Sequence, residues 1–529
     1  MASEHAPQPR AHGYAPRVAA LATTLFAGAV LSACVLPPKE AQHPTQLDDG
    51  RVGLTGVPVE PVADGWWKEF QDPQLDRLIR AGLEDNPTLA QAQTRVAAAL
   101  ASTEAERSRL LPQAKLGASV FYQRAPRNYF VPPPLAGHTF SEGQAGPTLS
   151  WDLDFWGKQA DAVRRAQALT QAAGLDVENA RLMLGVAIAQ AYVELYRQNG
   201  LAEIAERSAE QRKTIVDITR RRVSAGVDTQ LELREAEGQL PQALVARDEA
   251  RADAELAVHQ LAALTGQGAQ AYGAIHAPVL NIDAALPVPS ELPINLLARR
   301  PDVLSARLSV QAADAQRLAD KAAFYPDVSL TALGGFGAFG LDNLVKWSAR
   351  GYAGGPLISL PLFDGGRLRA EYKSSEAQLD AAVDGYNDTV LRAVQETADE
   401  ITRIDALARE RNEQQQTLQA NEAAYKLAEE RYRAGLASYL SVLNAETQVL
   451  AARQAMVDII AAQAIARVTL LQAVGGSFDA TRAAASARAD DPARAADPAR
   501  AAALARAADS VRADDSAPHS DPIPTRALP

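Results

Sequence analysis

The sequence predicts a mainly α-helical protein with a membrane β-barrel portion, built from one unit that occurs twice. Three observations predict this. The chain of 529 residues is rich in alanine, with 5 % aromatic residues, which favours helix. Short strand-like stretches interrupt the helical pattern in two places. Finally, AGVDTQLELREAEGQ (225–239) recurs 209 residues later as AGLASYLSVLNAETQ (434–448), which indicates a duplication.

The first 33 residues read as a signal peptide. Arg10 and Arg17 precede an apolar run that ends in small residues and is too short to span a bilayer comfortably. Residues 34–64, rich in proline and glycine, are expected to form an extended tether.

Cys34 is the expected lipidation site. The stretch Leu31-Ser32-Ala33-Cys34 resembles a bacterial lipobox, in which the cysteine thiol is diacylated and its new amine is acylated after cleavage. Cys34 is the only cysteine, so no intrachain disulfide is possible. Val35 is not the aspartate that commonly retains bacterial lipoproteins in the inner membrane, which suggests the outer membrane. The alternative is a plain secretory signal.

The first repeat is expected over 65–285. A helical pattern ends at Pro112, because proline cannot continue a helix. Strands are expected at about 115–123 and 147–155, each long enough for a tilted barrel strand. A long helical run then reaches a turn at Gly226, after which helix resumes to about Leu264.

The second repeat is expected over 286–475. Asn86-Pro87 matches Arg300-Pro301 at an offset of 214, and Gly146-Pro147 matches Gly355-Pro356 at an offset of 209. Strands are expected at about 327–337 and 351–363. A proline-free run then continues for about 100 Å of helix to a second turn at Gly435. The tail, 476–529, is rich in alanine, arginine, aspartate and proline and is expected to be disordered.

Four strands per chain cannot close a barrel, because the smallest bacterial outer-membrane barrels have eight. Either the chain oligomerises, which closed cyclic symmetry would satisfy, or the strands do not lie in a membrane.

The ordered set of motifs resembles the TolC-like outer-membrane factors of bacterial efflux pumps, specifically the lipoprotein branch called the OprM/NodT family. The resemblance covers about residues 34–475. Its motifs are Cys34, WWKEFQDPQLDRLI (66–79), NPTL (86–89), LLP (110–112), SWDLDFWGK (150–158), AGVDTQLELREAEGQL (225–240), LLARRPDV (296–303), FYPDVSL (324–330), GPLISLPLFDGGRLRA (355–370), YNDTVLRAVQETAD (386–399) and RYRAGLASYLSVLNAE (431–446).

The resemblance implies a homotrimer with a twelve-stranded barrel in the outer membrane, continued by an α-helical barrel across the periplasm. It implies a passive exit duct for drugs or other small molecules, without catalytic residues or a cofactor. The implied partners are a periplasmic adaptor protein and an inner-membrane pump of the resistance-nodulation-division class.

The resemblance also assigns site residues. Pro112 and Pro326 would be the swivels between helix and strand. The hairpin tips, Gly226 with Val227 and Gly435 with Leu436, would contact the adaptor. The aperture residues would be Leu440, Asn444 and Thr447. The family has an acidic residue and an arginine at the last two positions, so we expect a neutral closure here.

Other functions find little support in the sequence. The seven histidines show no metal-ligand spacing, and no P-loop, dinucleotide or nucleophile motif is present. The net charge of −11 gives no electrostatic case for nucleic acid. The serious alternative is a lipid-tethered periplasmic coiled-coil scaffold without a pore, which would not need two strand hairpins of membrane-spanning length.

Overall fold

The computed structural model describes residues 39, 41–54, 58, 62, 64–128, 132–283, 286, 289 and 291–479. The chain divides into two units, 1–478 and 479–529, and the description below concerns the first. The signal peptide, Cys34 and nearly all of the predicted disordered tail lie outside the described residues.

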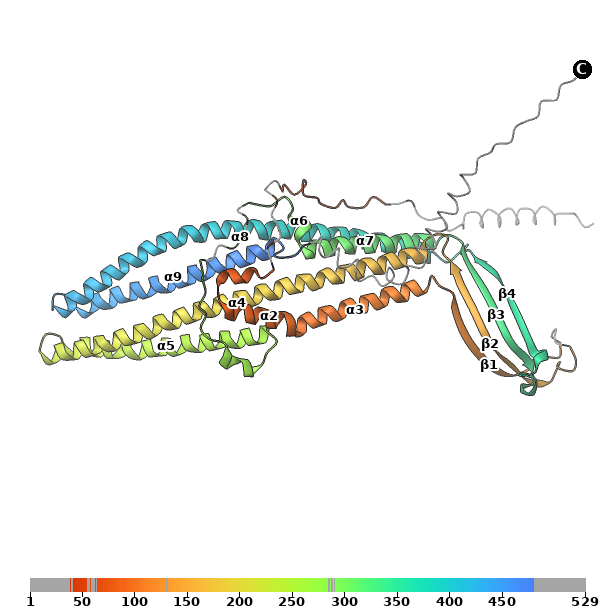
Figure 1. Ribbon diagram of the computed structural model, residues 1–529, viewed down its shortest axis with the longest axis horizontal. Coiled ribbons are helices and arrows are strands. Elements are labelled where there is room, and N and C mark those ends of the chain that lie inside the picture. The colour runs from red at the N-terminus through yellow and green to blue at the C-terminus, as the bar shows by residue number, and fades with distance from the viewer. Residues whose placement is uncertain are drawn as a thin grey trace, which may run out of the picture. The chain divides into compact units, whose positions relative to one another are not determined.

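Each repeat contains a short helix, a strand hairpin, a helix of 67 residues and a returning helix of 35 residues (Figure 1). The elements of the first repeat are η1 (Trp66–Phe70), α2 (Pro73–Asp85), α3 (Pro87–Ser108), β1 (Gln113–Arg124), β2 (Thr139–Leu153), α4 (Lys158–Ser224), α5 (Gln230–Leu264) and η2 (Ala269–Ala274). Those of the second are α6 (Leu296–Arg299), α7 (Pro301–Ala322), β3 (Asp327–Phe339), η3 (Leu341–Asn343), η4 (Trp347–Ala349), β4 (Arg350–Ser359), α8 (Arg367–Arg433) and α9 (Tyr439–Ala473).

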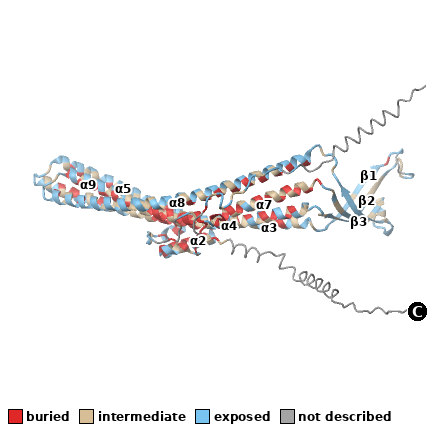
Figure 2. Cartoon of the chain, turned by 90° about the horizontal axis from the view of Figure 1, so that it is seen from above, coloured by how far each residue is buried: buried red, intermediate tan, exposed pale blue. Residues whose placement is uncertain are grey.

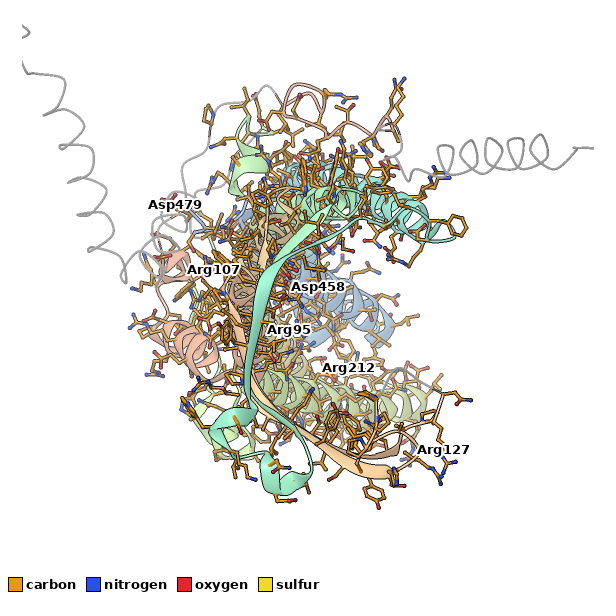
Figure 3. All side chains as sticks on the ribbon, turned by 90° about the vertical axis from the view of Figure 1, so that its right-hand side faces the viewer. Arg95, Arg107, Arg127, Arg212, Asp458 and Asp479 are labelled. Carbon is orange, nitrogen blue, oxygen red and sulfur yellow. The ribbon has the colours of Figure 1, made fainter. Side chains whose placement is uncertain are left out.

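The four strands form one antiparallel sheet in the order β1-β2-β3-β4. The two hairpins have equivalent registers, because adding the sequence offsets to the pair Gln113↔Ser150 gives the observed pair Asp327↔Ser359. The strands follow an arc rather than a closed ring when viewed from their end (Figure 3). Among the residues that the structure describes, the outer edges of β1 and β4 therefore have no partner strand.

The sheet has one apolar and one polar face, because successive side chains of a strand point to opposite sides. The pairs Leu116↔Pro147, Leu149↔Ala332 and Val328↔Ile358 place these residues on the same face. The apolar face carries Leu116, Val120, Tyr122, Leu149, Trp151, Val328, Leu330, Phe336, Tyr352 and Ile358. The other face is mainly polar but also carries Phe121, Leu333, Phe339 and Leu357; its polar residues are Lys115, Ser119, Gln123, Glu142, Gln144, Thr148, Ser150, Asp152, Ser329 and Thr331.

Two strands differ from the sequence prediction. β2 begins at Thr139 rather than at about 147, and β4 ends at Ser359 rather than at about 363. The stretch TFSEGQAG (139–146) contains two glycines, a glutamate and an alanine, which are depleted in strands. It becomes extended because its backbone pairs with β1 along the full length of that strand.

Two rows of helices connect the sheet to the hairpin turns. Each row consists of two helices placed end to end, and a side chain bridges the break between them. In one row α3 follows α5, and Asn86 Nδ2 donates to the carbonyl of Leu264 at 2.8 Å (Figure 1). In the other row α7 follows α9, and Arg300 Nη1 donates to the carbonyl of Ala473 at 3.1 Å. Both side chains satisfy carbonyls that the end of a helix leaves free.

Burial is greatest around the middle of the helical rows, and the turns and strands are mainly exposed (Figure 2). One core gathers Trp66, Phe70 and Ile79 against Ile188 and Leu261. A second core holds the apolar stripe of α8 against α7, α9 and the N-terminal segment, with members that include Leu54, Leu297, Val303, Leu379, Val383, Tyr386, Val390 and Leu470.

The described portion of the predicted tether is bound to α8. The backbone N–H of Leu47 donates to Asn387 Oδ1 at 2.8 Å, and Tyr386 Oη donates to the carbonyl of Leu47 at 3.1 Å. His43 Nδ1 lies 2.8 Å from Asp380 Oδ1. These contacts between the N-terminal segment and α8 were not predicted from the sequence, because they join residues more than 330 positions apart.

The helix α9 is long and apolar enough, by length and composition, to cross a membrane. We assign α9 to the helical rows because it packs against α8 and α4, with Val449, Ala461 and Leu470 almost fully buried.

Asn86→Ala tests the bridged break between α5 and α3. The side chain also caps α3 by accepting from the N–H of Thr88 at 2.8 Å. We expect the variant to lose about 1–2 kcal/mol of stability, the usual cost of losing such a cap, measured as a lower midpoint of thermal unfolding by circular dichroism. Thr94→Ala is the control, because that hydroxyl bonds only within α3. Equal midpoints for the two variants would contradict the role given to Asn86.

Candidate functional site

The two hairpin turns have the same backbone geometry. Gly226 and Gly435 have φ of 74° and 78°, the left-handed conformation in which glycine ends a helix without strain. The N–H of Val227 donates to the carbonyl of Arg222 at 2.9 Å, and that of Leu436 donates to Arg431 at 2.8 Å. Val227 and Leu436 are 59 % and 71 % exposed, so each turn presents one apolar side chain to its surroundings.

The residues after the two turns differ. In the first turn Thr229 caps α5, and Glu232 accepts from the N–H of Thr229 at 2.9 Å, which completes a capping box. In the second turn no side chain caps α9, and Ser438 Oγ lies 3.2 Å from Ser441 Oγ.

Three tyrosines at intervals of seven residues join the two hairpins of one chain. Tyr425, Tyr432 and Tyr439 are buried together with side chains from all four long helices. Their neighbours in this core are Ile215, Val216, Ala236, Val442 and Val449.

A polar network lies beside this core, close to the turns. Arg222 donates to both carboxylate oxygens of Asp228, at 2.7 and 2.9 Å, and its guanidinium carbon lies 4.4 Å from the centre of the Tyr432 ring. Tyr432 Oη donates to Asp228 at 2.8 Å and lies 2.9 Å from Thr219 Oγ1. The guanidinium lowers the pKa of Asp228, and burial raises the pKa of Tyr432 to about 12. Asp228 is therefore ionised near neutral pH, and Tyr432 keeps its proton.

A second ionic contact joins the hairpins further from the turns. Arg212 of α4 donates to Gln239 of α5, at 2.6 Å to Oε1 and 3.2 Å to the carbonyl, and its Nε lies 3.3 Å from Glu446 Oε1 of α9. Glu446 is 3 % exposed, and burial raises its pKa. The second repeat has Asn421 at the position of Arg212, and its Nδ2 donates only to the carbonyl of Gln448, at 3.3 Å.

The predicted aperture residues share one exposed stripe of α9. Leu440, Asn444 and Thr447 are exposed, and their spacing of four and three residues puts them on one side of the helix. Leu440 is 58 % exposed, and Thr447 Oγ1 donates to the backbone carbonyl of Leu443 at 2.9 Å. No charged side chain stands at these three positions, and their role as an aperture stays a prediction.

The predicted swivel prolines lie where helices meet strands. Pro112 separates α3 from β1, and Pro326 precedes β3. The sequence reasoning missed the two tryptophans that hold these corners. Trp151 Nε1 donates to the carbonyl of Leu110 at 2.9 Å, and Trp156 Nε1 donates to that of Pro326 at 2.8 Å. Both belong to SWDLDFWGK, so their presence in that motif was the available signal.

The described residues offer few side-chain arrangements that would indicate catalysis or metal binding. No group of three or more histidine, cysteine or acidic side chains among them could hold a metal ion. A polar cavity of about 320 Å³ between α4, α7 and α8 is lined by charged side chains that all have partners. Arg300 contacts Asp302 at 2.7 Å and Glu396 at 2.8 Å, and such paired groups have a structural role.

Long paired helices joined to a four-stranded sheet with two free edges define the subunit of a TolC-like channel. The model of the family described as outer membrane efflux protein matches residues 78–267 and 292–476, one segment in each repeat. The chain therefore belongs to this family.

Relatives of known function agree. MdtP of Shigella flexneri, a multidrug resistance outer membrane protein, is 30 % identical over 474 residues, which cover 87 % of this chain and 95 % of MdtP. FusA of Burkholderia cepacia, a fusaric acid resistance protein, is 38 % identical over 320 residues, or 60 % of each protein. The solved structure of the outer membrane protein VceC from Vibrio cholerae has a TM-score of 0.74 and 32 % identity, covering 79 % of this chain and 100 % of VceC. The chain is an outer-membrane channel component of an efflux system and extends into the periplasm.

The raised pKa of Glu446 gives a pH dependence that can be measured. A carboxyl whose pKa rises on folding stabilises the fold below its unfolded pKa, and this contribution is lost as the pH rises through the folded pKa. The groups around it are Arg212 of α4, Tyr425 of α8 and Tyr439 of α9. We expect the stability of Glu446→Gln relative to the wild type to increase with pH above about 4.3, the usual value of a glutamate pKa.

The measurement is the midpoint of thermal unfolding of the detergent-solubilised protein from pH 4 to pH 8. Glu430→Gln, at an exposed position of α8, controls for the loss of one negative charge. Parallel pH profiles for the wild type and Glu446→Gln would show that Glu446 does not contribute.

Proposed function

We propose that three copies of this chain close their sheets into one barrel in the outer membrane and their helices into one tunnel across the periplasm. Four strands per copy give twelve in three copies. The assembly is a passive duct, through which small molecules delivered by an inner-membrane pump leave the cell.

The observation that carries this proposal is the sheet itself. Its edges are unpaired in one chain, and an unpaired backbone group in lipid costs several kcal/mol. Pairing β4 of one copy with β1 of the next removes both edges. The apolar face then meets lipid and the polar face lines the channel, the alternation that membrane barrels have.

The hairpin turns are the proposed contact with a periplasmic adaptor protein. They lie at the end of the 67-residue helices, opposite the sheet, and they present Val227 and Leu436. Exposed apolar side chains at the end of a protein are suited to a partner surface. The partner pump is of the resistance-nodulation-division class, and the pump rather than the duct selects the drug or other small molecule.

The aperture is proposed at Leu440, where three copies would form a ring of leucines beside neutral Asn444 and Thr447. The tyrosine core, the hydrogen bonds of Tyr432 with Asp228 and Arg222, and the Arg212–Glu446 ion pair join the α4–α5 and α8–α9 hairpins of each copy. At the leucine ring itself the closure between copies depends on packing and neutral hydrogen bonds, because Asn444 and Thr447 carry no charge.

Cys34 is the proposed lipid anchor, and the position of the following segment supports it. The N–H of Ala41 donates to Glu376 of α8 at 3.3 Å. Glu376 lies nine residues from the start of α8, about 14 Å along the helix. The seven residues from Cys34 to Ala41 can extend about 23 Å, so an acylated Cys34 can reach the membrane surface.

Leu440→Ala tests the duct and its aperture together. We expect higher single-channel conductance in planar bilayers and, in cells that depend on this channel, greater sensitivity to vancomycin, which intact outer membranes exclude. The reason is that three leucine side chains are removed from the narrowest proposed point.

Leu231→Ala is the matched control, because Leu231 occupies the equivalent position of the first repeat and is 66 % exposed. A folded oligomer that shows no conductance in either form would refute the channel. Equal conductance of the two variants would refute the aperture at Leu440 but would leave the channel proposal standing.

Cys34→Ser tests the anchor. We expect loss of labelled palmitate from the protein and weaker membrane retention, since each buried methylene contributes about 0.8 kcal/mol. The measurement is radiolabelled palmitate incorporation with extraction at high pH. Wild-type protein that takes up no palmitate would refute lipidation.

A further inference from the structure

The register of the duplicated strands predicts how neighbouring copies meet, provided that the proposed ring forms. The junction of β4 with β1 of the next copy, here called the seam, is equivalent by repeat to the junction of β2 with β3. Applying the offsets of 209 and 214 to the observed pair Gly143↔Ala338 places Tyr352 opposite Arg124 of the neighbouring copy. The same offsets correctly relate the two hairpins within one chain.

The faces of the sheet support this register independently. Tyr352 and its partner Gly334 lie on the apolar face. Each is an even number of residues along its strand from a member of the pair Val328↔Ile358, which is on that face. Arg124 lies two residues beyond Tyr122 and four beyond Val120, which also belong to the apolar face. The predicted pair therefore joins residues of one face, which a shift by one residue would not do.

The seam ends at the outer rim, meaning the strand ends opposite the helices and the loops that connect them. Arg350 begins β4 there, on the apolar face, and its guanidinium carbon lies 4.5 Å from the centre of the Trp347 ring. Arg124 ends β1 at the same level, and Arg127 follows it in the loop (Figure 3). Neither Arg124 nor Arg350 has an ion pair with any carboxylate of the described residues.

The same rim exposes apolar and aromatic side chains. Val345, Trp347 and Tyr352 are 85 %, 73 % and 94 % exposed. The side chains of Leu341 and Leu344 lie against Gly143 of the apolar face, so the loop after β3 rests on the side of the sheet that faces lipid. Tryptophan and tyrosine favour the level of lipid headgroups, where arginine side chains can reach a charged group.

We propose that the outer rim of each seam binds the phosphate group of an outer-leaflet lipid, held between Arg350 of one copy and Arg124 of the next. Across an antiparallel pair the Cα atoms of Tyr352 and Arg124 would lie about 5 Å apart, with Arg350 two residues away. Two guanidinium groups without carboxylate partners can donate to one phosphate in bidentate fashion. The exposed tryptophan, tyrosine and valine favour a phosphorylated glycolipid over free phosphate, because they would contact its sugars and acyl chains.

Native mass spectrometry of the detergent-purified, full-length protein tests this proposal. The probes are bisphosphorylated lipid A and the same lipid after removal of its phosphates. We expect up to three bound lipids per trimer and a clear preference for the phosphorylated form. Arg124→Gln and Arg350→Gln should each weaken binding about tenfold, the effect of losing one charge-assisted contact.

Lys115→Gln is the control, because Lys115 is a basic residue of β1 at the opposite end of the strand and on the polar face. An intact trimer that binds both lipids equally, or whose arginine variants bind like the wild type, would overturn the lipid site while leaving the channel untouched. A protein without trimers would overturn the ring and the lipid site together.

Discussion

The structure depends on one constraint, the need to pair every backbone group of a sheet that lies in lipid. One chain provides four strands and leaves the outer sides of β1 and β4 unpaired. Each unsatisfied N–H or carbonyl in hydrocarbon costs several kcal/mol, so a single copy in the membrane is unfavourable. The apolar face, the polar face and the duplicated registers fit the proposed closed ring, and the proposed duct depends on that closure.

In the proposed ring the helices continue the barrel. They follow the same sequence repeat as the strands, except near the turns. Both rows are bridged at their breaks, by Asn86 in one repeat and by Arg300 in the other. Near the turns the repeats differ, because the first repeat has Val216, Val223 and Gln230 at the positions of Tyr425, Tyr432 and Tyr439. Arg212 reaches Glu446 across the two hairpins, whereas Asn421 at the equivalent position does not. These differences make the two hairpins of a chain one packed body.

Local sequence patterns predicted the elements well and the contacts between them poorly. The repeated offsets of 209 and 214 carry over to the strand registers, and the predicted turns at Gly226 and Gly435 lie between the long helices. The start of β2 was missed because pairing with β1, rather than residue preference, extends residues 139–146. Arg212, Trp151 and the binding of Leu47 to α8 were missed because their partners are distant in sequence.

The most direct test of the closed ring is a disulfide across the seam. The observed pair Thr148↔Leu333 predicts that Leu357 lies opposite Ser119 of the next copy, both on the polar face. Ser119→Cys combined with Leu357→Cys should give a covalent trimer on a non-reducing gel that a reductant separates, since paired Cα atoms are within disulfide range. Ser119→Cys with Ile358→Cys should not, because Ile358 points to the apolar face. Failure of the first pair, or equal cross-linking by both, would contradict the ring and its register.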